Sequence, residues 1–228
     1  MATYVMVAGG WAGGWAWKEV ASRLRAAGHE IYTPTCTGLG EREHLAHPGI
    51  DLDTHITDIA NVFRYEYLWD TILVGWSYGG MVTTGVAERL PERLRHLVYL
   101  DAWVPRDGEA QLDLFTDAAT RRAMREGLLA QGIWRVPHGP PDAPRRVAHP
   151  LRTSLQPLAV RNPEAAAVPR TFIRCTGFKG GPFVEAIERS YGRAREAGWR
   201  CRELPTGHCA LWTMPAETAA LLLEVAAL

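Results

Sequence analysis

The segment TILVGWSYGG, residues 71–80, constrains the fold more than any other part of the chain. The apolar run Thr71–Val74 leads directly into Gly75-Trp76-Ser77-Tyr78-Gly79, and a helix-like stretch then runs to Leu90, before Pro91. A Gly-x-Ser-x-Gly pattern between a strand and a helix is typical of a nucleophile elbow, a sharp turn that exposes the serine hydroxyl. Glycine on both sides lets the two backbones approach closely. The pattern predicts that Ser77 is a nucleophile; the alternative is a turn that matches by chance.

Short apolar runs alternate with helix-length amphipathic stretches along most of the chain. Several of the runs lack polar alternation, which is typical of strands buried on both faces of a parallel sheet. The alternation predicts an α/β fold with about six mostly parallel strands flanked by helices. The predicted strands are Tyr4–Val7, Glu30–Tyr32, Thr71–Val74, Leu97–Leu100, Thr171–Cys175 and Arg200–Leu204. The predicted helices are Trp15–Ala27, Leu52–Phe63, Tyr78–Leu90, Phe183–Ala197 and Pro215–Ala227.

Residues 105–168 interrupt this alternation. They hold a helix-like stretch, Gln111–Gly132, and then a proline-rich stretch with no convincing buried strand. Because ligands bind at the carboxyl edge of the strands in open α/β sheets, we interpret the segment as a small helical, proline-rich cap over that edge. The alternative is a long excursion without function. The predicted organisation is a core in two parts, residues 1–104 and 169–228, separated by a cap at residues 105–168.

Composition excludes several kinds of partner. The 228 residues carry 25 Lys and Arg against 25 Asp and Glu, so the chain lacks the basic excess that nucleic-acid or membrane binding usually requires. The eight histidines form no closely spaced pair that predicts a metal site, and no organic cofactor is implied. No leader-like segment precedes the first strand, and the four cysteines show no CxxC spacing, so we expect a cytoplasmic protein. The oligomeric state is not fixed by the sequence, and a homodimer remains a candidate.

A serine hydroxyl is a poor nucleophile unless a base accepts its proton. His208, in Leu204-Pro205-Thr206-Gly207-His208, follows the last predicted strand and is the best candidate for that base. His55 lies within a predicted helix, where a structural or solvated role is expected. His138 and His149 lie in the proline-rich stretch and are candidates to line the cap.

The loop Gly9-Gly10-Trp11-Ala12-Gly13-Gly14 directly follows the first predicted strand. Backbone N–H groups aimed at a developing negative charge form an oxyanion hole, and the N–H groups of Gly10 and Tyr78 are the candidates here. The start of the helix after Ser77 also favours an anion. The alternative is a phosphate-binding loop, but neither a GxGxxG nor a Gly-Lys-Ser/Thr pattern is present.

With these motifs in place, the chain resembles the α/β-hydrolase superfamily. It is most similar to the small-cap branch of plant methyl-ester esterases, hydroxynitrile lyases and their bacterial relatives. The similar stretches are GGWAGGW at 9–15, TPTCTGLGEREHL at 33–45, VGWSYGG at 74–80, LVYLDAWVPRDG at 97–108, PRTFIRCT from 169 and REAGWRCRELPTGH to 208. They cover nearly the whole chain outside the cap. The resemblance implies an α/β-hydrolase fold, but it covers both esterases and lyases.

The sequence departs from this family at the third member of the catalytic triad. Relatives usually have Asp after the penultimate strand, where this chain has Phe178. The acid holds the histidine in the correct tautomer, so a substitute is needed for full activity. Asp101, at the end of the neighbouring predicted strand, is the best candidate. Its alternative role is to cap the turn toward Val104-Pro105.

Four tryptophans are candidates to bind substrate. Trp11 and Trp76 flank the glycine-rich loop and the elbow, Trp103 lies beside Asp101, and Trp134 lies in the cap. Large aromatic side chains also serve the core, and that is the alternative for each. If they face the site, the substrate is a small hydrophobic molecule, bulky or aromatic.

Three functions remain open at this point. The first is a serine hydrolase acting on a carboxylic ester or thioester through Ser77 and His208. The second is a lyase, dehydratase or cyclase that uses the same pocket for acid–base chemistry, as in natural-product tailoring, which the missing acid favours. The third is a catalytically idle ligand-binding protein, which the retained serine and histidine disfavour.

Overall fold

A computed structural model of the chain describes residues 1–115, 118–137, 145–177 and 181–228. Within these residues a six-stranded sheet runs in the order β2-β1-β3-β4-β7-β8, and every pair of neighbouring strands is parallel. All six predicted strands are present, and the sheet is wholly rather than mostly parallel. Its strands are β1 (Thr3–Val7), β2 (Glu30–Tyr32), β3 (Thr71–Trp76), β4 (Leu94–Leu100), β7 (Arg170–Cys175) and β8 (Arg200–Leu204).

Helices cover both faces of this sheet, so that alternate residues of the central strands bury in two separate cores. Val5 and Val7 of β1 face a core shared with α2 (Leu52–Tyr65), α3 (Gly79–Arg89) and α7 (Pro182–Glu196). Tyr4 and Met6 face the opposite core, formed with α1 (Lys18–Ala26) and α9 (Pro215–Ala226). Burial on both faces explains why these strands are apolar without alternation.

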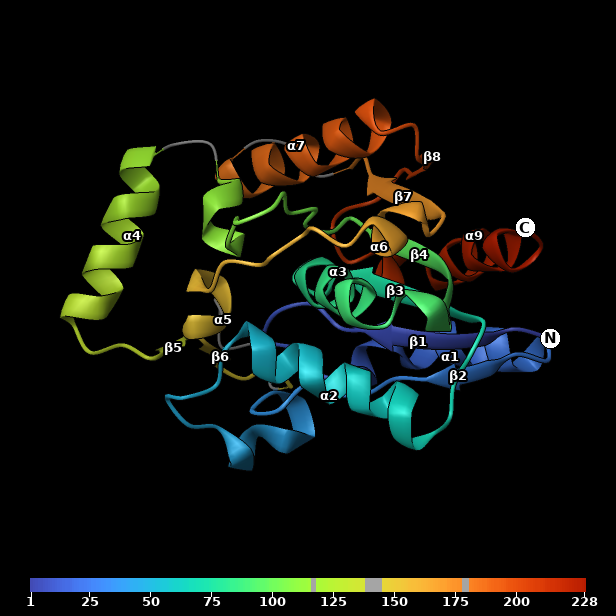
Figure 1. Cartoon of the computed structure of the whole chain (residues 1–228), viewed down its shortest axis with the longest axis horizontal. Coiled ribbons are helices and arrows are strands. Elements are labelled where there is room, and N and C mark those ends of the chain that lie inside the picture. Colours follow the sequence, from blue (N-terminus) through green and yellow to red (C-terminus); the bar gives the residue numbers. More distant parts are fainter. Residues whose placement is uncertain (116–117, 138–144, 178–180) are drawn as a thin grey trace.

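Most of the predicted cap, from α4 (Ala118–Ala130) to α5 (Arg152–Leu155), lies at the end of the molecule opposite the two termini (Figure 1). The predicted cap residues form η4 (Gln111–Leu114), α4, α5 and α6 (Pro163–Ala167). They also form a short antiparallel pair, β5 (Arg135–Val136) with β6 (His149–Pro150), which the sequence did not predict. A strand of only two residues is too short to show an alternating pattern of apolar and polar side chains.

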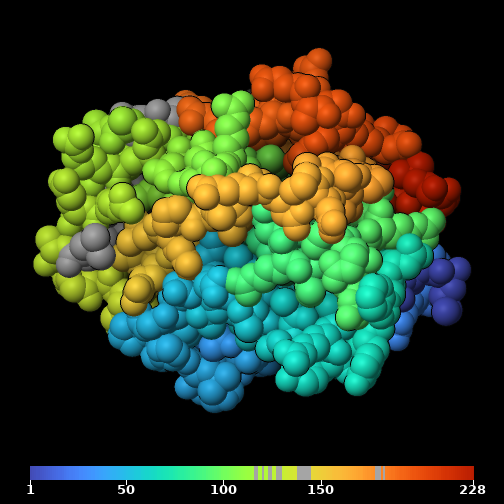
Figure 2. Space-filling view, in the orientation of Figure 1, coloured from blue at the N-terminus to red at the C-terminus, as the bar shows by residue number. Residues whose placement is uncertain are grey.

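The last part of the predicted cap rejoins the core. From α5 to α6 the chain crosses the face shown in Figure 2 as a continuous amber band, between the helices α3 and α7. The α6 helix packs against α3. Part of the proline-rich stretch, with His138, lies outside the described residues, and so does Phe178.

No helix among the described residues is both long enough and apolar enough to cross a bilayer.

Candidate active site

Ser77 sits at the turn between β3 and α3 in a left-handed backbone conformation, with φ of 55°. Backbone hydrogen bonds hold it there: its N–H donates to the Leu100 carbonyl at 3.2 Å, and its own carbonyl accepts from Gly80 and Trp103. Such a conformation costs on the order of 1–3 kcal/mol and persists only when the surroundings enforce it. The turn is therefore the strained elbow that the sequence pattern predicts.

The glycines of the pattern are needed for steric reasons. A methyl group on Gly75 would lie 2.6 Å from the Gly79 carbonyl oxygen, and one on Gly79 would lie 2.7 Å from the Val7 carbonyl oxygen. These contacts are with backbone atoms, which cannot move aside as a flexible side chain would. Gly9, across the site, is also confined, although less tightly, because its methyl group would lie 3.0 Å from the Ser77 Cβ atom.

His208 lies in the loop between β8 and the short helix α8 (Ala210–Thr213), and its side chain is mostly buried. Aromatic rings flank it: Trp76 at 5.4 Å and the edge-on ring of Phe183 at 4.6 Å between centroids. The Trp76 indole N–H also donates to the His208 carbonyl at 2.8 Å. The imidazole is thus held in position by contacts on both its ring and its backbone.

Asp101 follows β4 and lies against this histidine. Its Oδ2 atom is 2.6 Å from His208 Nδ1, and its Oδ1 atom accepts the Cys175 backbone N–H at 2.9 Å. Both carboxylate oxygens are therefore used, and the residue is only 2% exposed. Because a carboxylate only accepts hydrogen bonds, Nδ1 carries the proton and Nε2 is left as the basic nitrogen.

The structure thus brings Asp101 and His208 together from positions 107 residues apart in the chain. Asp101 has a φ of 44°, and its own N–H donates to the Ile173 carbonyl at 2.7 Å. Its side chain serves the histidine and the end of β7 rather than the turn toward Val104-Pro105. The position of Phe178, where relatives carry the acid, lies outside the described residues.

The candidate oxyanion amides belong to Gly10 and Tyr78. Tyr78 is the residue that precedes α3, so its N–H lies at the positive end of the helix dipole. Within the described residues, neither amide donates to a backbone or side-chain acceptor. Unpaired N–H groups at this point suit an oxygen that gains negative charge.

Residues of the predicted cap hold the loop that contains Gly10. Trp11, the next residue, has a φ of 63° and makes three hydrogen bonds to cap residues. Its backbone N–H donates to His149 Nδ1 at 3.3 Å, its indole N–H to the Val136 carbonyl at 2.8 Å, and its carbonyl accepts from the Val147 N–H at 3.0 Å. The conformation of this loop therefore depends on the cap.

Two buried histidines, His55 and His149, contact Tyr78. The Tyr78 hydroxyl donates to His55 Nδ1 at 2.9 Å, and His55 Nε2–H donates to the Thr37 carbonyl at 2.9 Å. The His149 ring lies edge-on to Tyr78, with centroids 4.6 Å apart, and its Nε2–H donates to Thr153 Oγ1 at 2.8 Å. Each ring nitrogen thus has one hydrogen-bond partner. In each imidazole one nitrogen donates and the other accepts, which is the pattern of the neutral form.

Burial keeps both imidazoles neutral. It lowers the pKa of His55 to about 4, with the nearby Asp58 carboxylate opposing the shift, and it lowers the pKa of His149 well below the usual value. The same burial raises the pKa of the Tyr78 phenol. The structural role expected for His55 agrees with this burial. The sequence offered no sign of the hydrogen bonds that link the two histidines to the elbow and the loop.

The four tryptophans singled out from the sequence lie in different surroundings. Trp76 contacts His208, and Trp103 is buried with its ring edge-on to Phe183 at 5.1 Å. Trp11 lies where the predicted cap meets the core, whereas the contacts of Trp134 are within the predicted cap, where its carbonyl accepts the Leu151 N–H. The sequence did not single out Phe183, which packs on the histidine. No described group of three His, Cys, Asp or Glu residues is arranged to hold a metal ion.

Comparison with known proteins places the chain among esterases. Residues 4–221 match the model described as the alpha/beta hydrolase family. The chain is 36% identical over 238 residues to a protein named carbendazim hydrolyzing esterase from Nocardioides sp. (strain SG-4G), covering 96% of this chain and 97% of that one. Methylesterase 1 of Arabidopsis thaliana is 32% identical over 113 residues, which are 45% of this chain and 40% of the plant protein.

Solved structures share the fold over its whole length. An extracellular α/β-hydrolase from a Paenibacillus species superposes with a TM-score of 0.81 at 22% identity, covering 98% of both chains. The methylesterase MES16 from Arabidopsis gives a TM-score of 0.74 at 21% identity, covering 100% of this chain and 99% of that one. At these identities the likeness establishes the fold.

We predict that acid destabilises the protein partly through His55. An unfolded histidine titrates near 6.5 and the folded His55 at about 4, so between these pH values the unfolded state binds more protons. The free energy of unfolding should therefore be highest above about pH 6.5 and should fall as the pH drops toward about 4. The measurement is urea unfolding of the wild type and of His55→Gln across this range.

His55→Gln can still donate to the Thr37 carbonyl but does not titrate, so its stability should fall less steeply with acid. The control is His44→Gln, which changes an exposed histidine. Equal pH slopes for wild type and His55→Gln would contradict the prediction.

Proposed function

The chain belongs to the α/β-hydrolase family and is an enzyme of the esterase type, and from this premise we propose that Ser77, His208 and Asp101 are its catalytic triad. The observation that carries the proposal is the 2.6 Å contact between His208 Nδ1 and Asp101 Oδ2. Asp101 thus supplies the acid that relatives carry at the position of Phe178. The strained Ser77 turn and the two unpaired amides of Gly10 and Tyr78 supply the other parts of the site.

In the proposed reaction Ser77 Oγ attacks the carbonyl carbon of the ester while His208 Nε2 accepts the hydroxyl proton. The carbonyl oxygen becomes negative and accepts hydrogen bonds from the N–H groups of Gly10 and Tyr78. The tetrahedral intermediate then expels the alcohol, or the thiol of a thioester, which takes its proton from His208. Water attacks the acyl-enzyme in the same way and releases the carboxylic acid and free Ser77.

Asp101 contributes through its charge and its position. The carboxylate stabilises the imidazolium that forms when His208 accepts a proton, and it fixes the tautomer that leaves Nε2 basic. Two departures from the family favoured a lyase, dehydratase or cyclase over a hydrolase: the missing acid, and Ala8 in place of the usual loop histidine. With a buried carboxylate on His208, the first of these reasons no longer applies.

We propose a small, hydrophobic and aromatic ester as the substrate class. The ring of Phe183 lies edge-on to His208 and is partly exposed, so it offers aromatic surface next to the reacting carbonyl. Trp76 also contacts His208, but it is buried and supports the imidazole rather than the substrate. The relatives named above include a plant methylesterase and an esterase that is named for the hydrolysis of carbendazim. A hydrophobic acyl or alkyl group would displace water from this surface.

The reaction is proposed to take place in the cytoplasm. All four cysteines are free thiols, which suits a reducing compartment.

The first prediction of this proposal concerns the nucleophile. A fluorophosphonate probe reacts with a serine only when a base activates its hydroxyl. Intact mass spectrometry should show one adduct on the wild type and none on Ser77→Ala. A folded wild-type protein that gains no adduct would refute the hydrolase mechanism, and an adduct that persists in Ser77→Ala would place the nucleophile elsewhere.

The second prediction concerns the acid. Asp101→Asn can still accept the Cys175 N–H through its oxygen, but its NH2 group then faces His208 Nδ1 and favours the wrong tautomer. We expect kcat on an activated aryl ester to fall by about 10³–10⁴-fold with little change in the unfolding midpoint. The matched control is Asp113→Asn, which changes a carboxylate in the cap. A loss below about tenfold would exclude Asp101 as the acid.

The third prediction concerns His149, which we expect to act as a positioning residue for the loop of Gly10. His149→Leu removes the acceptor for the Trp11 N–H, whereas the oxygen of His149→Asn can lie near the original Nδ1 position. Because one buried hydrogen bond contributes about 1–2 kcal/mol, kcat should fall about tenfold or more in His149→Leu. It should be partly restored in His149→Asn, with KM little changed in both. Equal kcat in the two variants would show that the acceptor at this position is unimportant.

A further inference from the structure

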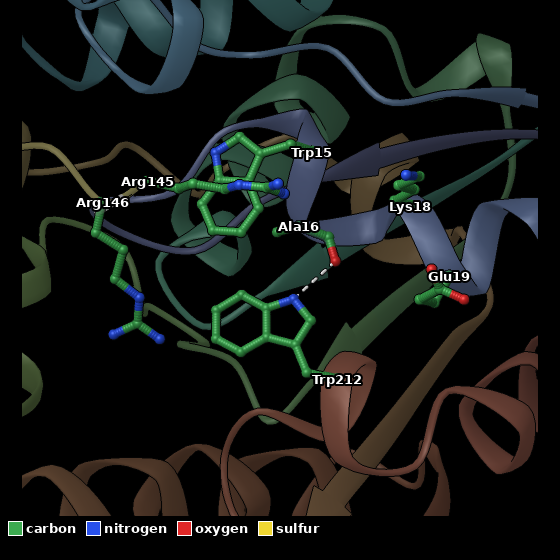
Figure 3. A pocket seen from close by; sticks show the side chains of 7 residues that line it. All are labelled: Trp15, Ala16, Lys18, Glu19, Arg145, Arg146 and Trp212. Atoms are coloured by element: carbon green, nitrogen blue, oxygen red, sulfur yellow. Dashed lines mark hydrogen bonds between the residues drawn. The ribbon is translucent and has the colours of Figure 1, made fainter. Parts of the chain in front are cut away.

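A pocket of about 400 Å³ opens beside the catalytic centre, and neither Ser77 nor His208 lines it. Its walls come from three distant parts of the chain: η1 (Gly14–Trp17) with the start of α1, the segment before β6, and α8. The residues that matter for its chemistry are Trp15, Lys18, Glu19, Arg145, Arg146 and Trp212, shown in Figure 3. A pocket of this size fits a molecule of one or two rings.

Two indoles form the apolar part of the pocket. The rings of Trp15 and Trp212 are nearly parallel, at 6°, with centroids 5.8 Å apart. Trp212 is fixed further by its N–H, which donates to the Ala16 carbonyl at 2.9 Å (Figure 3). Rigid aromatic surface of this kind favours a flat aromatic ligand, because little side-chain entropy is lost on stacking.

The polar part of the pocket is cationic. The Arg145 guanidinium lies 5.7 Å from the centre of the Trp15 ring, and the Arg146 guanidinium lies 4.9 Å from that of Trp212. Lys18 adds a third positive charge, and among the described residues that line the pocket Glu19 is the one carboxylate. Within the described part of the chain neither Lys18 nor Arg145 forms a salt bridge. The pocket therefore keeps a positive excess although the chain as a whole has none.

We propose that this pocket binds a planar aromatic carboxylate at a site distinct from the catalytic serine. The ring would pack on the indoles while the carboxylate pairs with the cations at the rim. A neutral aromatic compound would use only the first contact, and an aliphatic carboxylate only the second. Binding of such a ligand does not require an active enzyme. We further interpret the ligand as the carboxylic acid that is released from an aromatic ester, and this interpretation rests on the proposed function.

The pocket is in contact with the catalytic histidine through one intervening side chain. The Trp212 ring lies edge-on to Trp76, with centroids 5.4 Å apart, and Trp76 contacts His208 at the same distance. Arg146 also donates to the Sγ atom of Cys209, the residue after the histidine, at 3.8 Å. A ligand in the pocket therefore lies close to the elements that hold His208.

The test is titration of the full chain with 2-naphthoate, followed by the indole N–H signals of ¹⁵N-labelled protein. Trp15→Phe and Trp212→Phe assign two of the signals, and Trp76→Phe assigns the signal nearest the catalytic centre. We expect saturable shifts of the Trp15 and Trp212 signals, and at least about tenfold weaker binding of 2-naphthalenemethanol, which lacks the charge.

Charge variants sharpen the test. Lys18→Gln combined with Arg145→Gln should weaken naphthoate binding by about tenfold, since each partly exposed ion pair contributes up to about 1 kcal/mol. The control is Arg64→Gln on α2, an exposed arginine outside the pocket, which should bind as the wild type does.

The proposal and the proposed function can fail separately. Shifts confined to Trp76, or equal affinity for the neutral compound, would overturn the carboxylate pocket. Neither result would affect fluorophosphonate labelling of Ser77. Conversely, naphthoate could shift the indole N–H signals of Trp15 and Trp212 in protein whose Ser77 does not react with the fluorophosphonate. That result would support the carboxylate pocket but would contradict the interpretation of its ligand as the product of ester hydrolysis.

Discussion

The hydrogen bond between Asp101 and His208 is the contact on which the site depends, and it exists only because of the parallel sheet. Asp101 leaves the end of β4, its second oxygen accepts a backbone N–H from the end of β7, and His208 follows β8. These three strands are consecutive in the sheet. Because parallel strands all present their carboxyl ends at one edge, residues 101, 175 and 208 meet there in the correct order. A mixed sheet would have sent one of them to the opposite edge.

Three of the five described non-glycine residues with positive φ lie at this same edge. Ser77 and Asp101 directly follow β3 and β4, Trp11 lies in the loop after β1, and all three are non-glycine residues with φ between 44° and 63°. The three strands are neighbours, so the strained residues surround one point. Their conformations are held by backbone hydrogen bonds to adjacent strands and, for Trp11, by the cap. The stability of the sheet therefore maintains conformations that the residues would not adopt alone.

Local pattern was enough to predict the strands, the main helices and the Ser77 turn, because each depends on residues close together in the sequence. Asp101 could be named only as a candidate, since the reach of its side chain depends on how far β4 and the β8 loop lie apart. The contact of His149 with Trp11 joins residues 138 positions apart, and that of Trp212 with Ala16 joins residues 196 apart. Neither leaves a periodic signal. A histidine in a proline-rich stretch and a tryptophan in a glycine-rich loop look like ordinary loop residues until the chain is folded.

The junction between cap and core also differs in kind from the two apolar cores below it. Apolar packing tolerates small displacements, whereas the hydrogen bonds that join Trp11 to His149, Val136 and Val147 require defined directions. Because these groups are partly buried, a broken bond would leave a polar group with limited access to water. A polar junction of this type holds the predicted cap residues in one orientation relative to the loop after β1. Since Trp11 is hydrogen-bonded to those residues and Gly10 precedes it, their orientation affects the position of the Gly10 amide, which is the amide assigned to the proposed oxyanion hole.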